Sequence, residues 1–122
     1  MKIAIVILNW NGQKLLEKFL PSIIKYSDLN NVEIYVADNA STDNSVSFTK
    51  AHFPLVKVIQ NKKNGGYAKG YNDALKCLKE PIFCLLNNDV EVTDNWLEPI
   101  IQIFNEEPNT GIIQPKILDY KR

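Results

Sequence analysis

The sequence has almost none of the residues from which several common kinds of site are built. It holds one histidine and two cysteines, Cys77 and Cys84, in 122 residues. Two cysteines form neither a disulfide framework nor a paired-CxxC zinc site, so we expect two buried, reduced thiols. Acidic and basic residues number 14 each, which gives a formal net charge of zero. Without a basic excess or a lysine-rich segment, nucleic acid is not an expected partner.

The sequence also lacks a hydrophobic run long enough to cross a bilayer. The apolar start of the chain, MKIAIVILNW, is too short for a membrane span. No small-residue cleavage site of a secretory signal follows it. We therefore interpret this run as a strand and expect a cytoplasmic protein. Peripheral attachment at the inner membrane face is left open for a full-length form.

Two well-known phosphate-binding loops are missing as well. No GxGxxG follows the first apolar run, which disfavours a dinucleotide-binding Rossmann domain, and no GxxxxGK[ST] occurs, which excludes a P-loop. A different glycine pair, in Asn64-Gly65-Gly66, opens a predicted helix. Bare backbone N–H groups at a helix start suit a phosphate. Taken alone, a simple glycine turn explains this segment equally well.

What the sequence does contain is a regular alternation of strand and helix patterns. Apolar, β-branched runs predict buried strands over residues 3–8, 32–37, 55–59, 82–86 and 111–118. Apolar residues at helical spacing predict helices over residues 15–24, 46–53, 67–78 and 96–104. We expect the first helix to kink or restart at Pro21, and Thr93 or Asp94 to cap the last. The alternation predicts one α/β domain over residues 1–122, a mostly parallel sheet with helices on both faces.

Polar segments follow the first four predicted strands. They are Asn9-Trp10-Asn11-Gly12, residues 38–43, residues 61–66, and Asn87-Asn88-Asp89. Any one of them alone is explained by turn chemistry, because Asn, Asp and Gly favour turns. Parallel strands, however, end at one edge of the sheet, and ligands of such sheets bind beyond the carboxyl ends of the strands. Four polar segments at this edge therefore predict a ligand site.

Two carboxylates suggest which ligand this edge would bind. Asp38 ends an apolar strand, where it can accept a hydrogen bond from a nucleobase N–H or cap the next helix. Asp89 is a hard oxygen ligand of the kind that holds Mg²⁺ or Mn²⁺ against a diphosphate. These features predict a nucleotide rather than an apolar ligand.

In their order along the chain, the segments IVILNWNG, VADNASTDNS, IQNKKNGGYAKGYNDAL, LLNNDV and GIIQPKI carry a resemblance. The whole chain resembles the nucleotide-binding half of GT-A-fold glycosyltransferases, specifically the large inverting family numbered two. The nearest likeness is to rhamnosyltransferase-like members that decorate cell-surface polysaccharides. The resemblance implies inverting transfer of a hexose from a nucleotide-diphospho-sugar, a UDP- or dTDP-sugar, to a saccharide acceptor.

The resemblance also implies roles for individual residues. Asn9, Trp10 and Asp38 would hold the nucleobase. Asn64 and Gly65 would hold ribose and diphosphate. The DxD motif of the family reads Asn87-Asn88-Asp89 here, so its first acid is an amide. Asn87 can bond a ribose hydroxyl, whereas the metal, Mg²⁺ or Mn²⁺, would rest on Asp89 alone among protein groups.

Members of this family are longer, and their later half carries the acceptor site and the general base. The resemblance therefore places the catalytic base beyond Arg122, and we expect the 122-residue chain to be inactive alone. An uncovered apolar face on the strand predicted over residues 111–118 would favour self-association, for instance as a homodimer.

Two other kinds of protein remain as alternatives. The first is a non-catalytic module that binds a nucleotide or a sugar nucleotide. The second is a receiver-like signalling domain, which has a similar length and alternation. A receiver needs acidic residues after its first strand, and no acid occurs here before Glu17. The receiver is therefore disfavoured.

Overall fold

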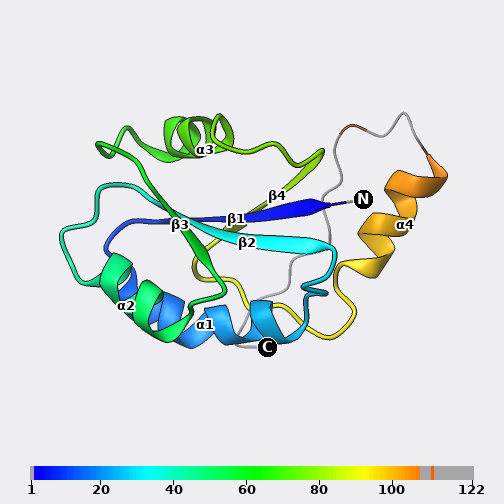
Figure 1. Ribbon diagram of the computed structural model, residues 1–122, viewed down its shortest axis with the longest axis horizontal. Coiled ribbons are helices and arrows are strands. Elements are labelled where there is room, and N and C mark those ends of the chain that lie inside the picture. Colours follow the sequence, from blue (N-terminus) through cyan, green and yellow to red (C-terminus); the bar gives the residue numbers. More distant parts are fainter. Residues whose placement is uncertain (1, 108–110, 112–122) are drawn as a thin grey trace.

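The computed structural model describes residues 2–107 and 111 (Figure 1). Within these residues, strands and helices alternate as the sequence predicts. Their bounds are β1 (Ile3–Asn9), α1 (Gln13–Lys25), β2 (Val32–Asp38), α2 (Ser45–His52), β3 (Lys57–Gln60), α3 (Tyr67–Leu75), β4 (Ile82–Asn87) and α4 (Glu98–Glu106). The strand predicted over residues 111–118 lies, apart from Gly111, outside the described residues.

The four strands form one parallel sheet in the order β3-β2-β1-β4. This confirms the predicted α/β class. The register pairs Asn9 with Asp38 and Leu8 with Asn87. The carboxyl ends of β1, β2 and β4 are therefore level, and the polar residues that end these strands lie side by side.

The sheet is covered on both faces, with β1 at its centre. Figure 1 shows α1 and α2 on one face and α3 on the other. Successive residues of β1 pack on opposite faces of the sheet, because neighbouring side chains of a strand point in opposite directions. Ile5 packs in the cluster with α1, whereas Val6 packs in the cluster with Tyr71 and Ala74 of α3. Each fully buried Ile or Leu of this kind contributes roughly 1.5–3 kcal/mol.

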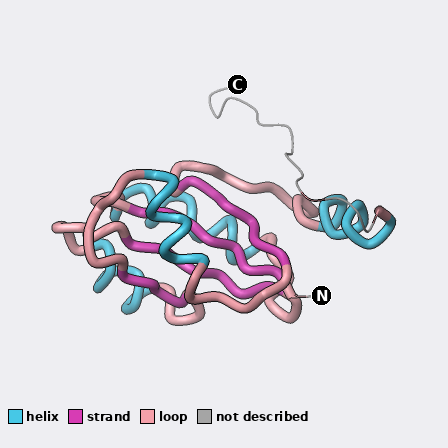
Figure 2. The backbone as a smooth tube through the Cα atoms, turned by 90° about the horizontal axis from the view of Figure 1, so that it is seen from above, coloured by secondary structure: helices cyan, strands magenta, loops and turns pink. Residues whose placement is uncertain are grey.

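The cover is incomplete over β4. Phe83 and Leu85 lie on the α3 side of the sheet, beside Ala4 and Val6 in the register, and are 40% and 49% exposed. Figures 1 and 2 show why, since α3 packs over β1 and β2 and α4 lies beside the sheet rather than over it. The expectation of helices on both faces is confirmed, and the described helices leave Phe83 and Leu85 of β4 partly exposed.

Helix α1 does not break at Pro21, contrary to the prediction. Proline removes one backbone donor, but the carbonyl that loses its partner belongs to the exposed Glu17, where water can replace the bond. Leu20 and Ile23, on either side of the proline, are both 1% exposed and hold the helix on the sheet. Tertiary packing therefore outweighs the local preference.

The predicted ends of two helices also differ from the observed ones. Neither Thr93 nor Asp94 caps α4, whose N-cap is the buried Leu97. Helix α3 ends at Leu75 instead of continuing to residue 78. As a result Cys77 lies in a turn and is exposed, so the expectation that both thiols are buried is wrong for Cys77. Burial raises the pKa of the other thiol, Cys84, to about 11.

The third strand begins two residues later than predicted, at Lys57. The preceding Leu55 is 64% exposed, whereas Val56 is buried in the core.

No helix among the described residues is long and apolar enough to cross a membrane.

Candidate functional site

The segments that follow β1, β2 and β3 are joined at the carboxyl edge of the sheet by backbone hydrogen bonds. The N–H of Asn39 donates to the carbonyl of Asn9 at 2.8 Å. The N–H of Asn61 donates to the carbonyl of Asp38, also at 2.8 Å. The sheet hydrogen bonding thus continues one residue into the loops, and the loops are fixed relative to one another.

Asp38, a predicted nucleobase ligand, is held by its neighbours and is 2% exposed. Its Oδ1 accepts hydrogen bonds from Asn9 Nδ2 at 3.0 Å and from the Ser41 hydroxyl at 2.7 Å. Its Oδ2 accepts from the N–H of Ser41 at 2.9 Å. A carboxylate has about four lone-pair positions. One acceptor position on Oδ2 therefore has no protein donor.

Asn9, the second predicted nucleobase ligand, has no exposed surface. Its Nδ2 donates to Asp38 and to the Ser41 hydroxyl, at 3.0 and 3.4 Å. Its Oδ1 accepts from Asn88 Nδ2 at 2.9 Å. The Asn9 side chain is thus a bridge between the ends of β2 and β4 rather than a surface that a ligand touches.

The loop before α3 is held by Asn39, which sequence reasoning did not single out. Asn39 is 2% exposed, and its Nδ2 donates to Asn64 Oδ1 at 3.0 Å and to the carbonyl of Gly66 at 3.2 Å. Asn64 Oδ1 also accepts from the N–H of Gly66 at 2.9 Å. The backbone of Gly66 has φ 96°, a conformation that glycine adopts without strain. Asn64 therefore shapes the loop through its side-chain oxygen, although Asn64 is exposed, as is Gly65 beside it.

Helix α3 also braces the last residues of β4. Its Tyr71 is 6% exposed, and the hydroxyl donates to the carbonyl of Leu86 at 2.7 Å. Leu86 immediately precedes Asn87. Tyr71 thus fixes the strand end from which the Asn87-Asn88-Asp89 segment departs. The sequence placed Tyr71 in a helix but gave no signal for this contact.

Asp43 and Asn11 bind the loops to the first turns of α1 and α2. Asn11 Oδ1 accepts from the N–H groups of Thr42 and Asp43, at 2.7 and 3.1 Å. The Asp43 carboxylate accepts from the N–H of Ser45 at 2.9 Å and from the N–H of Gln13 at 3.3 Å. Burial raises the pKa of Asp43, but the hydrogen bonds from Ser45 and Gln13 outweigh it and lower the pKa overall. A carboxylate at two helix starts is stabilised in its charged form.

The remaining predicted site residues face outward. Trp10 is 56% exposed, and Gly65, Asn87 and Asp89 are exposed as well. Asn88, between Asn87 and Asp89, is half-buried against Asn9. At the carboxyl edge, a network of buried amides therefore lies in the interior. The groups exposed at its surface are the ring of Trp10, the carboxylate of Asp89, the amide of Asn87 and the N–H of Gly65.

Residues 4–120 match the protein family described as "Glycosyl transferase family 2". The chain belongs to this family. In the curated relatives it resembles an "Uncharacterized glycosyltransferase" of Haemophilus influenzae, with 26% identity over 81% of this chain and 31% of the relative. It also resembles the "Glycosyltransferase GlyG" of Streptococcus pneumoniae, with 28% identity over 91% of this chain and 38% of the relative. The chain thus spans about a third of the length of these relatives.

Solved structures show the same fold. The S. aureus protein TarS, in a crystal structure with UDP-GlcNAc, matches with a TM-score of 0.77 and 22% identity over 93% of this chain and 37% of that one. The mannosyltransferase PcManGT from Pyrobaculum calidifontis, in complex with GDP-Man and Mn²⁺, matches with a TM-score of 0.65 and 23% identity over 74% of this chain and 28% of that one. The four-stranded parallel sheet is therefore that of GT-A glycosyltransferases.

The side chains at the carboxyl edge offer few ligands for the divalent metal that the resemblance implies. No group of three or more His, Cys, Asp or Glu side chains that could hold a metal occurs within residues 2–107 and 111. The exposed carboxylate of Asp89 and the amide of Asn87 are the oxygen donors at the end of β4. Such a set suits Mg²⁺ or Mn²⁺ that is held mainly by substrate phosphates and water, not by a protein cage.

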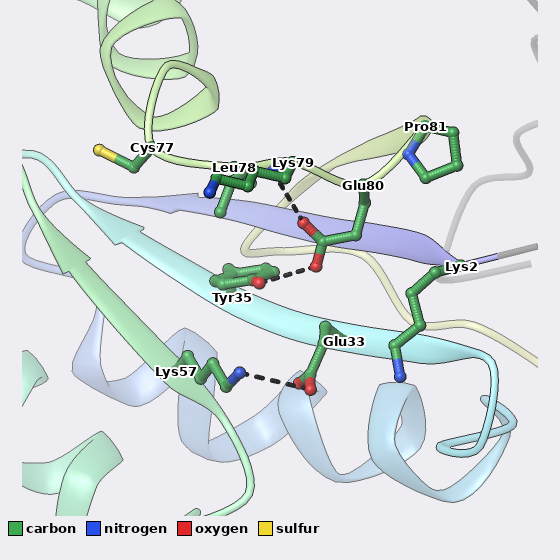
Figure 3. Close-up of a pocket in the computed structure, with 9 residues that line it drawn as sticks. All are labelled: Lys2, Glu33, Tyr35, Lys57, Cys77, Leu78, Lys79, Glu80 and Pro81. Carbon is green, nitrogen blue, oxygen red and sulfur yellow. Dashed lines mark hydrogen bonds and ion pairs between the residues drawn. The ribbon is translucent and has the colours of Figure 1, made fainter.

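An open hollow of about 510 Å³ lies at the opposite edge of the sheet (Figure 3). There the Tyr35 hydroxyl donates to Glu80 Oε2 at 2.7 Å, and Lys57 pairs with Glu33 at 3.4 Å. Burial and then the contact with Glu80 raise the pKa of Tyr35 above its usual range. These paired groups sit at the amino ends of the strands, away from the carboxyl edge where parallel sheets bind ligands. The hollow is therefore separate from the candidate site at the carboxyl edge.

Proposed function

We propose that the chain binds a nucleotide-diphospho-sugar at the carboxyl edge of the sheet and serves as the donor domain of an inverting glycosyltransferase. The observation that carries this proposal is the buried Asp38 carboxylate, whose Oδ2 keeps one acceptor position without a protein donor. Its register partner Asn9 immediately precedes the exposed Trp10. An oriented carboxylate next to an aromatic ring suits a nucleobase that donates an N–H and stacks.

The other exposed groups would serve the rest of the donor. Asn87 would bond a ribose hydroxyl, and the N–H of Gly65, in the loop before α3, would face the diphosphate. Asp89 would hold Mg²⁺ or Mn²⁺, which neutralises charge on the departing nucleoside diphosphate when bound. The buried Asn9 and the exposed Asn64 would act through the groups they orient.

In the whole enzyme, the acceptor hydroxyl would attack the anomeric carbon in one displacement and invert its configuration. The leaving group would be the nucleoside diphosphate, stabilised by the α3 start and the cation. We propose a saccharide of a cell-surface polysaccharide as the acceptor, and uracil or thymine as the base of the donor. The general base belongs to none of the four segments at this edge.

A non-catalytic binding module is the second candidate, because the chain spans about a third of its curated relatives. A turnover assay on the 122-residue chain beside a longer chain of the family separates the two. Transfer by the longer chain only would assign donor binding to this domain and catalysis to the whole. Transfer by neither would favour the module.

Calorimetric titration tests the proposal directly. We expect UDP or dTDP to bind more tightly than GDP, and Mn²⁺ to strengthen that binding. The pairing of each nucleotide with and without Mn²⁺ separates the base contact from the diphosphate contact. Absence of binding for all three nucleotides, with the fold intact by circular dichroism, would contradict the proposal.

A further inference from the structure

We propose that Asn88 and Asn9 are positioning residues that tie the diphosphate end of the site to its base end. This rests on the proposed function, and it adds a role for two side chains that touch neither ligand half. The observation behind it is one continuous chain of hydrogen bonds, from Asn88 Nδ2 to Asn9 Oδ1 at 2.9 Å and from Asn9 Nδ2 to Asp38 Oδ1 at 3.0 Å.

The sheet register makes this chain possible. Strand β1 lies between β2 and β4, and Asn9 at its end pairs with Asp38 while Leu8 pairs with Asn87. Asn88, one residue past β4, is therefore within reach of Asn9, although the two are 79 positions apart in sequence. The bridge crosses three adjacent strands at the level where the ligand would bind.

The amide at position 9 makes both contacts at once. An asparagine side chain carries a carbonyl acceptor and an NH₂ donor, whereas a carboxylate only accepts and an aliphatic chain does neither. Asn9 has no exposed surface, so water cannot substitute for a lost partner. Its orientation therefore depends on Asn88 on one side and on Asp38 and Ser41 on the other.

The space beside the bridge is kept open by Gly12. Its backbone has φ −114° and ψ 37°, which any residue can adopt, so the conformation does not require glycine. A Cβ at this position would instead overlap both Asn88 Nδ2 and Asn9 Oδ1. Gly12 is thus explained by the bridge, and it gives an independent way to disturb the same bond.

The consequence concerns base recognition. With Asn88 turned inward to Asn9, its neighbours Asn87 and Asp89 are exposed on the ligand side. The same bond fixes the amide that orients Asp38 Oδ1, and hence the free position on Oδ2. Loss of Asn88 would loosen the carboxylate that distinguishes one base from another.

The test measures base selectivity, taken as the ratio of the Kd for GDP to the Kd for UDP with Mn²⁺ present. In Asn88→Ala we expect this ratio to fall by about fivefold, the effect of one lost hydrogen bond. Gly12→Ala should lower it similarly. Asn44→Ala, the same change at an exposed asparagine before α2, should leave it unchanged.

An Asp38→Asn background provides the decisive comparison. If Asn88 acts through Asp38, adding Asn88→Ala to Asp38→Asn should change the ratio no further. Equal losses of UDP and GDP affinity in Asn88→Ala, with the ratio intact, would indicate a merely structural role and overturn the bridge. That outcome leaves donor binding standing, whereas a wild-type chain that binds no nucleotide refutes both proposals.

A measurement on the wild-type chain covers the case in which the variants do not fold. Pyrophosphate with Mg²⁺ occupies only the diphosphate end. Its addition should shift the side-chain amide NMR signal of Asn9 and leave that of Asn44 in place. An Asn9 signal that stays unmoved while pyrophosphate binds overturns the bridge.

Discussion

At the scale of residues, amides rather than charges hold the site together. Asn9, Asn39, Asn61 and Asn64 each donate or accept between loops, and Asp38 is the single buried carboxylate among the described residues. An amide satisfies a donor and an acceptor without the desolvation penalty of an ion. The network can therefore lie beneath a nucleotide without repelling its phosphates.

Asp38 and Asp43 begin and end the same polar segment, residues 38–43, yet their contacts predict different effects of substitution on nucleotide affinity and on stability. Asp38→Ala should weaken UDP binding by roughly 1.5–3 kcal/mol, because a charge-assisted contact to the base is removed. Asp43→Ala should leave UDP affinity closer to wild type and instead lower stability by about 1 kcal/mol, since Asp43 caps the start of α2. Calorimetry and thermal unfolding on both variants measure these effects, and the reverse ranking of affinities would refute the base contact.

Asn87 offers a test of the metal assignment. Asn87→Asp places a second hard carboxylate near Asp89 and should tighten Mn²⁺ binding in the presence of UDP on the order of tenfold. Asn72→Asp adds the same charge on the exposed side of α3 and serves as the control. If calorimetry finds the same Mn²⁺ affinity in Asn87→Asp and wild type, the end of β4 does not face the metal.

At the scale of elements, prediction succeeded where burial dominates the pattern. The apolar runs of β1 and β2 are buried on both faces, so composition alone locates them. Predictions of helix boundaries were wrong where tertiary contacts outweigh local preferences. Helix α1 continues through Pro21, and the N-cap of α4 is Leu97 instead of a polar residue. Strand existence is a property of the segment, whereas a helix end also depends on what the segment packs against.

The hydrogen bond from Tyr35 to Glu80 joins β2 to the connection before β4 (Figure 3). It should make the free energy of unfolding depend on pH in the acidic range. Burial raises the pKa of Glu80, but the hydrogen bond from Tyr35, the backbone hydrogen bonds from Glu80 and Lys79 and the charge of Lys57 together outweigh it and leave the pKa lowered. A carboxyl with a lowered folded pKa adds stability above its unfolded pKa of roughly 4.3, and loses that contribution as pH falls through the folded pKa.

Tyr35→Phe should therefore cost about 1 kcal/mol of unfolding free energy near pH 7, and less as the pH drops below about 4. Urea unfolding across this pH range measures the difference. Tyr67→Phe removes a hydroxyl from a side chain that is 58% exposed and should not alter the acid profile. A Tyr35→Phe deficit that persists unchanged in acid would show that Glu80 does not carry the effect.

At the scale of the whole molecule, the sequence predicts which residues end the strands at one edge, but not the hydrogen bonds that join the loops there. Strand ends in a parallel sheet share one edge, so Asp38, Asn87 and Asp89 could be grouped from the sequence. The contacts of Asn39, Tyr71 and Gly12 join segments that lie far apart in the chain, and no local pattern marks them. Patterns in a single sequence predict the secondary structure of a segment, whereas the contacts between distant segments are seen only in the folded structure.

The open side of β4 leads to the last prediction. Within the described residues β4 pairs only with β1, and its Phe83 and Leu85 remain partly exposed beside that free edge. An unpaired strand edge with an apolar face favours association with another chain. We expect the 122-residue chain to form dimers or larger species by light scattering, and Leu85→Lys to shift it toward monomer. Leu55→Lys, at another exposed leucine, should leave the distribution unchanged. A monomeric wild type, or equal effects of the two variants, would show that this surface does not drive association.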